Sequence, residues 1–239
     1  MKKKNILILS ILIPFLLTSC VQTTIDGSGT ATNEQRTVSP FDKISIKGIF
    51  TVYLSQGDVE SVVVEIDDNL QQYVEVRNEG SKLALDIADS IRFGKTTKNN
   101  IYVTVKDIEL LSITGVCTVK TLAPLKCTFL TINVSGVSSG ELEMYCDKLN
   151  VNISGVGNIE LRGSTTELDV QKSGVGNFNG KMLEAAKVNV VNSGVGSVSV
   201  YATQELSMTN SGVGSITYSG DADIKTINSS GVGKIRKDE

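Results

Sequence analysis

The side chains that could carry chemistry in this 239-residue chain are carboxylates and thiols, because the chain contains no histidine. Imidazole is the usual proton shuttle near neutral pH and the commonest nitrogen ligand of transition metals. A Ser-His-Asp triad and a His-ligated zinc site are therefore excluded. Glycoside chemistry remains open, since it needs two carboxyl groups about 5 to 9.5 Å apart. The candidate carboxylate pairs are Asp67 with Asp68, Glu141 with Glu143, and Asp221 with Asp223.

The N-terminus predicts an exported protein with a lipid anchor. Three lysines precede the apolar run Ile6–Leu17, as in a secretory signal, and this run is shorter than the roughly 20 residues that cross a bilayer. The end of the run, Leu17–Cys20, resembles the lipobox of bacterial lipoproteins, in which the cysteine is acylated. The alternative is an ordinary secretory signal with an incidental cysteine. We expect a signal peptide over 1–19, and a lipidated Cys20 with a flexible, polar leash over 20–40.

The charge balance argues against nucleic acid as a partner. Three of the 23 basic residues lie in the signal segment, so the mature chain would carry 20 basic and 26 acidic residues. A mildly acidic surface cannot neutralise phosphates. The expected location is the cell envelope, on a bacterial outer membrane, with the side of the membrane left open.

Sequence repeats dominate the second half of the chain. A Ser-Gly-Val-Gly-like motif recurs every 18 to 21 residues, and apolar residues alternate with polar ones before and after it. Alternation with period two predicts strands, and about 19 residues suit one turn of a β-solenoid whose coils stack about 4.8 Å apart. The copies begin at Thr114, Ser135, Ser154, Ser173, Ser193, Ser211 and Ser230.

The glycines of the motif predict a tight corner, and we expect its valine to turn into the core. Stacking would then give one internal valine ladder and one serine ladder. On this interpretation Val175→Asp would bury an unpaired charge and unfold the protein. The valines are Val116, Val137, Val156, Val175, Val195, Val213 and Val232.

Residues 41–110 repeat the alternation less regularly. The opening Phe41–Ile44 with Gly48, the turn Gln56-Gly57 and the Gly-Val-Gly repeats resemble the head GIN domain family of auto-transporter adhesins, found as lipoproteins and secreted proteins of Bacteroidetes. The resemblance covers about residues 41–236. It implies one domain over 41–239, folded as an all-β, right-handed parallel β-helix (β-solenoid) similar to that of pectin lyases. It also implies adhesion, with no assigned catalytic residues.

Two cysteines hold the same position in neighbouring repeats. Cys127 lies three residues before Leu130 and Cys146 lies three residues before Leu149, so stacking would bring the two cysteines about 5 Å apart, within disulfide range. They either form a disulfide in an exported compartment or fill a tight corner as small residues. Cys117 replaces a corner glycine, and no cationic neighbour is evident to activate its thiol.

The carboxylate pairs are better explained as solvated surface. Lyases and hydrolases built on a β-helix cluster acids and basic residues on one face, and neighbouring repeats neither repeat nor complement these acids. The repeats also lack the aspartate of the GGxGxD calcium motif. We therefore expect no catalytic residues, no metal and no cofactor, with a polysaccharide-active lyase or hydrolase as the alternative.

One exterior strip of the repeats is polar and almost uncharged. Its interpretation is either routine hydration with stacked amides and hydroxyls, or a surface that contacts a sugar or a cell-surface protein. We predict a monomeric, non-catalytic, adhesin-like or scaffolding envelope protein. The strip consists of Thr131, Asn133, Asn150, Asn152, Asp169, Gln171, Asn189, Ser207, Thr209, Thr226 and Asn228.

Overall fold

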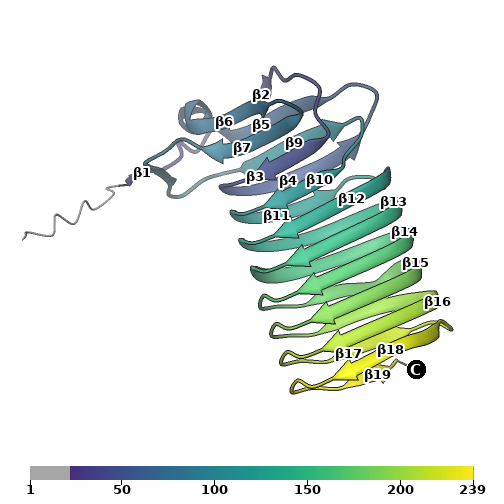
Figure 1. Cartoon of the computed structure of the whole chain (residues 1–239). Helices are drawn as coiled ribbons and strands as arrows, with labels where there is room; N and C mark the ends of the chain where they lie inside the picture. The colour runs from purple at the N-terminus through teal and green to yellow at the C-terminus, as the bar shows by residue number, and fades with distance from the viewer. Residues whose placement is uncertain (1–21, 239) are drawn as a thin grey trace, which may run out of the picture.

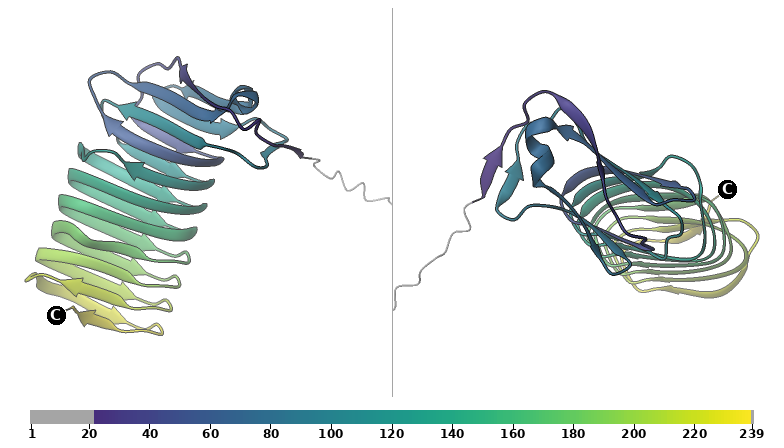
Figure 2. Two further views of the ribbon diagram at one scale, coloured as in Figure 1. Left: turned by 180° about the vertical axis from the view of Figure 1, so that it is seen from behind. Right: turned by 90° about the horizontal axis from the view of Figure 1, so that it is seen from above.

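The computed structural model describes residues 22–238 and shows a β-solenoid of about seven turns with a cap of shorter strands at its N-terminal end (Figure 1). Seen from above, the coils lie over one another and the N-terminal strands lie beside and across the first of them (Figure 2). The expected signal peptide over 1–19 and the expected lipidation at Cys20 lie outside the described residues.

Parallel strands in register build the coils, which confirms the predicted solenoid and its period. Each strand pairs with the equivalent strand of the next coil, so hydrogen bonds run along the solenoid axis. The strands are β3 (Lys43–Ile46), β4 (Ile49–Gln56), β10 (Leu110–Ile113), β11 (Val116–Thr121), β12 (Leu125–Val134), β13 (Val137–Ile153), β14 (Val156–Lys172), β15 (Phe178–Asn192), β16 (Val198–Asn210), β17 (Ile216–Ser219), β18 (Asp223–Ser229) and β19 (Ile235–Lys237).

The first coils do not stack in chain order. β3 pairs in parallel with β10 on one side and with β7 on the other, while β4 lies between β11 and β9. The coil made by β7 and β9 therefore lies outside the coil made by β3 and β4. The remaining elements are β1 (Thr23–Ile25), β2 (Ala31–Arg36), β5 (Ser61–Asp67), the 3-10 helix η1 (Asp68–Tyr73), β6 (Val74–Glu79), β7 (Lys82–Ile87), β8 (Ile91–Phe93) and β9 (Asn99–Val105).

Antiparallel strands cover the N-terminal end of the stack. β2 pairs antiparallel with β5, β5 with β9, and β6 with β7. These pairings occupy strand edges that would otherwise be free to template further pairing. The 3-10 helix η1 connects β5 to β6.

The expected flexible leash is wrong for residues 23–36, which form two strands. β1 pairs with β8, and all six residues of β2 pair with β5. Between them, Ser28 N donates to Asn69 Oδ1 at 2.9 Å, and Asp68 N donates to Thr30 O at 2.9 Å. The polar composition misled because this segment is held by hydrogen bonds at a sheet edge and buries little apolar surface.

Inward-facing side chains of all coils form one continuous apolar core. Leu149, Val151 and Ile153 of β13 are fully or almost fully buried, and the same alternation holds in β14 and β16. Burial on one side and hydration on the other is what fixes the register of each coil.

The expected internal valine ladder is wrong, because the corner valines point outward. Val175 is 49% exposed, whereas Gly174 before it is buried. A Cβ atom at Gly174 would overlap the carbonyl oxygen of Gly155 in the preceding coil, so only glycine fits at this inward-facing position. The next residue, Val175, therefore faces outward. The serines that begin the motif are exposed as well. Gly176, which follows the valine, has a φ of 124° that favours glycine.

Candidate functional site

All eleven residues of the predicted polar strip lie in two parallel columns on the outer side of one face. Each column follows the register of successive coils, so its members are separated by one coil spacing, about 4.8 Å. The first column is Thr131, Asn150, Asp169, Asn189, Ser207 and Thr226. The second is Asn133, Asn152, Gln171, Val191, Thr209 and Asn228, in which Val191 is the only apolar member.

A third column beside these two alternates in charge, and the strip predicted from the sequence left it out. Lys148, Glu167, Lys187 and Glu205 are aligned coil by coil. Lys148 Nζ lies 3.2 Å from Glu167 Oε2, and both side chains are half exposed, so the pair adds little to stability. Each of the four residues immediately precedes a buried aliphatic residue at the equivalent place in its coil, and this position was the signal that could have found the column; the buried residues are Leu149, Leu168, Val188 and Leu206.

Together the three columns line an open groove of about 470 Å³ over four coils. Asn189 Nδ2 donates to Asp169 Oδ2 at 2.7 Å, and Gln171 Nε2 donates to Asp169 Oδ1 at 3.3 Å. Asn152 Nδ2 donates to Asn133 Oδ1 at 2.8 Å. These contacts between and along columns hold the amides in defined orientations. The groove thus presents fixed donors and acceptors at regular intervals.

The charges that line the groove nearly cancel. Lys148 and Lys187 face the carboxylates of Glu167, Asp169 and Glu205. Such a surface neither attracts a polyanion nor repels a neutral polar chain. Amide and carboxylate groups bind hydroxyls through paired donors and acceptors, so the arrangement suits a chain that carries many hydroxyl groups.

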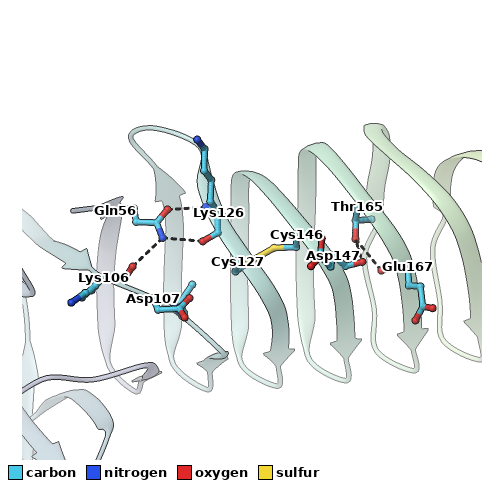
Figure 3. Close-up of a disulfide and its surroundings, with 10 residues drawn as sticks. Gln56, Lys106, Asp107, Lys126, Cys127, Cys146, Asp147, Thr165 and Glu167 are labelled. Carbon is cyan, nitrogen blue, oxygen red and sulfur yellow. Dashed lines mark hydrogen bonds between the residues drawn. A yellow bond between two sulfur atoms is a disulfide. The ribbon is translucent and has the colours of Figure 1, made fainter. Parts of the chain in front are cut away.

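A disulfide joins the two cysteines that the repeats bring together. Cys127 of β12 and Cys146 of β13 lie in register, with Cα atoms 4.7 Å apart, and the bond links adjacent coils (Figure 3). It closes a loop of 19 residues, for which chain entropy gives a stabilisation of about 3 kcal/mol. Gln56 binds the same stretch of β12, donating to Lys126 O at 2.9 Å and accepting from Lys126 N at 2.8 Å.

The thiol of Cys117 is buried and unreactive by its surroundings. Burial raises the pKa of Cys117 to about 11, and a hydrogen bond from the backbone of Phe50 lowers it too little to offset this. A nucleophilic cysteine needs the opposite shift. The structure therefore places this residue in the core.

The carboxylates of Asp67 and Asp68 fasten the N-terminal segment. Asp67 is buried and accepts hydrogen bonds from Gly29 N at 2.9 Å, Thr97 N at 2.7 Å and Thr97 Oγ1 at 2.8 Å. Burial alone would raise the pKa of Asp67, but these donors outweigh it and hold the pKa below its ordinary value. Ser28 Oγ donates to Asp68 Oδ1 at 2.5 Å. The pair is occupied by structural contacts.

The other two carboxylate pairs lie on the surface beside lysines. Lys120 Nζ lies 3.0 Å from Glu141 Oε2, and Lys225 Nζ lies 2.6 Å from Asp223 Oδ2. Among residues 22–238, no three His, Cys, Asp or Glu side chains are grouped so that they could hold a metal ion. In the same residues no helix is long and apolar enough to cross a membrane.

Solved structures with this fold include proteins from Bacteroides and Parabacteroides species. A putative adhesin from Bacteroides fragilis is 28% identical, with a TM-score of 0.86, covering 90% of this chain and 100% of that one. A putative lipid binding protein from Parabacteroides distasonis is 24% identical, with a TM-score of 0.67, covering 91% and 100%. A putative adhesin from the same species is 22% identical, with a TM-score of 0.67, covering 90% and 100%.

The two Parabacteroides structures share the fold, and their identity to this chain is too low to carry more. No functionally curated protein matches the sequence. The family model that matches covers residues 40–222, which is most of the solenoid and its cap. The chain therefore belongs to the family described as "Putative auto-transporter adhesin, head GIN domain".

Proposed function

We propose that this protein is a non-catalytic lipoprotein of the bacterial cell envelope with an adhesin-like role, and that the groove binds a neutral glycan chain. The observation that carries the proposal is the three-column groove, in which amides, hydroxyls and balanced charges repeat from coil to coil. The family description and the Bacteroides fragilis relative support a role in adhesion. They also support a cell-envelope location in a member of the Bacteroidetes.

Periodicity is the reason to expect a chain as the ligand. A linear polymer with hydroxyls at regular intervals can meet the same side chains in several coils, so weak contacts add up along its length. The described residues that line the groove include no aromatic ring, and recognition would rest on hydrogen bonds. A free monosaccharide would occupy one coil and bind far more weakly.

The test is a glycan array and envelope polysaccharides probed with the purified protein, followed by product analysis of every hit. The variant Asn150→Ala/Asn189→Ala removes two amides of the first column and should weaken binding at least about tenfold. Asn179→Ala, on the strand that follows the corner, is the matched control and should leave binding unchanged. Equal binding by both variants would place the ligand elsewhere.

A polysaccharide-active enzyme is the alternative, and the same experiment decides it. Shortened products from any bound glycan would overturn the non-catalytic proposal. The three carboxylate pairs do not favour this outcome, because Asp67 and Asp68 hold the N-terminal segment and the other pairs lie next to lysines.

The proposed anchor is the acylated Cys20. Cys20→Ser should move most of the protein from the membrane fraction to the soluble fraction, with Cys117→Ser as the control that stays in the membrane. Retention of Cys20→Ser at the level of the unaltered protein would contradict the anchor. We also propose that the protein is monomeric, which sedimentation in detergent would check.

A further inference from the structure

A ridge of exposed aliphatic side chains runs the length of the solenoid along its Ser-Gly-Val-Gly corner. Its members stack in register from coil to coil. Each is between 42% and 73% exposed, although one of its two neighbours in the chain is buried in every coil but the last. The ridge consists of Ile49, Val116, Val137, Val156, Val175, Val195, Val213 and Val232.

The borders of the ridge are polar and uncharged over most of its length. Ser173 and Asn177 lie two residues before and after Val175, and the coils of Val195 and Val213 have serines at both of these positions. At the N-terminal end the ridge forms one wall of a groove of about 880 Å³. A long apolar line with a neutral polar border is uncommon on a soluble surface and marks a contact site.

The beginning of the described chain lies against this ridge. Gln22 lines the same groove as Val116, Val137 and Val156. The next residues are fixed, because β1 pairs with β8 and Thr23 N donates to Ser90 O at 2.7 Å. Figure 1 shows the N-terminal segment on the edge where the corners project. Only Val21 separates Gln22 from Cys20 in the sequence, so the Cα atoms of Gln22 and Cys20 can be at most about 7 Å apart.

We infer that the valine ridge contacts the lipid bilayer to which the protein is anchored, so that the solenoid lies along the membrane surface. The inference rests on the proposed lipidation of Cys20. An anchor beside one end of the ridge holds the remaining coils close to the bilayer surface. The uncharged border lets the ridge enter the headgroup region, where apolar side chains reach the acyl boundary.

A bilayer fits the ridge better than a second copy of the chain does. The ridge is one residue wide and about half exposed, so two ridges in contact would bury on the order of 500 Å² per copy, below the roughly 800 Å² per partner of a stable complex. A lipid surface needs no complementary shape. It can follow the ridge over the roughly 34 Å that seven coil spacings span.

The first test measures depth in the membrane with the lipidated full chain in vesicles of phosphatidylethanolamine and phosphatidylglycerol. A spin label is placed at Val175→Cys, or at Glu184→Cys, an exposed position about halfway round the same coil. The native thiols do not interfere, because Cys117 is buried and the others are paired or proposed to be acylated. At Val175, oxygen should relax the label several-fold more than a water-soluble nickel complex does, and at Glu184 the order should reverse.

The second test separates the ridge from the anchor. In a Cys20→Ser background, flotation with the same vesicles should persist partly and should not fall in about 0.5 M salt, because the ridge is uncharged. Adding Val137→Ser, Val156→Ser, Val175→Ser and Val195→Ser should reduce flotation about tenfold. Met182→Ser, which removes an equally exposed apolar side chain from the far side of the coil, should not.

Three results overturn the inference. The first is a Val175 label that is as accessible to nickel as the Glu184 label. The second is flotation that the serine substitutions leave unchanged. The third is a ridge that is shielded from both relaxing agents in a sedimenting dimer, which would assign it to a second copy. Absence of an acyl group on Cys20 by mass spectrometry would remove the anchor, while flotation of the unmodified protein would still test the ridge.

Discussion

The coils and the N-terminal cap are held together in different ways. In the coils from residue 110 onward, equivalent residues pair by backbone hydrogen bonds, so each coil repeats the contacts of the one before. In the cap, side chains that occur once make the decisive contacts. Arg36, for example, donates to both the backbone and the side-chain oxygen of Gln71, at 2.8 and 2.9 Å.

This difference shows what each region demands of its sequence. A coil needs glycine where backbones approach and alternation elsewhere, and it accepts many side chains on its outer surface. The cap ends a stack of strands, and it must satisfy backbone groups that no further coil would pair. The substitutions that destabilise the protein should therefore fall at different kinds of position in the two regions.

The largest effect is expected at the inward glycine of a corner. In Gly174→Ala the new methyl group would overlap the carbonyl of Gly155, and backbone must move to relieve it. We expect a loss of at least about 3 kcal/mol in the free energy of unfolding, measured by urea denaturation. Gly140→Ala is the control, because its nearest neighbour is the side-chain atom Ile159 Cδ1 at 3.1 Å, which can shift. Equal losses in both would contradict the backbone argument.

A smaller effect is expected in the cap, where Asp67→Ala removes the acceptor of three hydrogen bonds. Buried donors left without a partner should lower the free energy of unfolding by about 2 to 3 kcal/mol. Limited proteolysis should cut residues 22–36 first while the coils persist. Proteolysis that begins in the coils would contradict a local role.

The pH dependence of the same site has a definite sign. The folded pKa of Asp67 is lowered relative to the unfolded value of about 3.9, so its contribution is present above that value and is lost as pH falls through the folded pKa. Asp67→Asn should abolish this loss. A variant that keeps the acid sensitivity of the unaltered protein would assign it to other groups.

Within the coils, one interior column changes from aliphatic to polar along the stack. Ile113, Val134 and Ile153 are followed in register by Lys172, Asn192 and Asn210, all buried. Lys172 Nζ donates to Val195 O at 2.8 Å, and Asn192 Nδ2 donates to Asn210 Oδ1 at 2.9 Å. The polar members therefore bind one another and the corner backbone.

Lys172→Met tests whether the buried ammonium opposes folding. Burial lowers the pKa of Lys172, so the unfolded chain holds this proton more tightly than the folded protein does. At pH 7 the variant should be more stable by about 1 kcal/mol, and the difference should shrink as pH rises from the folded pKa towards the unfolded value of about 10.4. Denaturation at several pH values measures this, with exposed Lys187→Met as the control. A difference independent of pH would contradict the sign.

The period, the strands and the two polar columns could be predicted because every repeat contains the same pattern of residue types. The direction of the corner valines was also available in the sequence. Alternation through Leu149, Val151 and Ile153 continues to Gly155, so it places Val156 outside. The prediction failed because it assumed that an apolar residue between glycines must face the core. The close approach of backbones between coils, which demands the inward glycine, is visible only in three dimensions.

The cap could not be predicted in the same way. The position of β7 and β9 outside β3 and β4 depends on contacts between segments that are distant in sequence, and no sequence repeat indicates this arrangement. β2 is a polar edge strand in which no residue is buried, so it lacks the alternation that marks a strand. The charged column that lines the groove had a signal in the sequence, since Lys148 and Glu167 precede equivalent core residues, but the predicted strip was defined as a surface with almost no charge and so excluded it.

The smallest effect is expected where the sequence led to the opposite view, at Val175. Because its side chain is half exposed at the corner, Val175→Asp places the new carboxylate in water, and the free energy of unfolding should fall by less than about 0.5 kcal/mol. Val170→Asp, five residues earlier on the inward side of β14, buries an unpaired charge and should prevent folding or cost several kcal/mol. Urea denaturation of the two proteins measures the contrast. A severe loss of stability in Val175→Asp would indicate that the corner valines lie in the core. It would also contradict the exposed ridge along which the solenoid is proposed to meet the membrane.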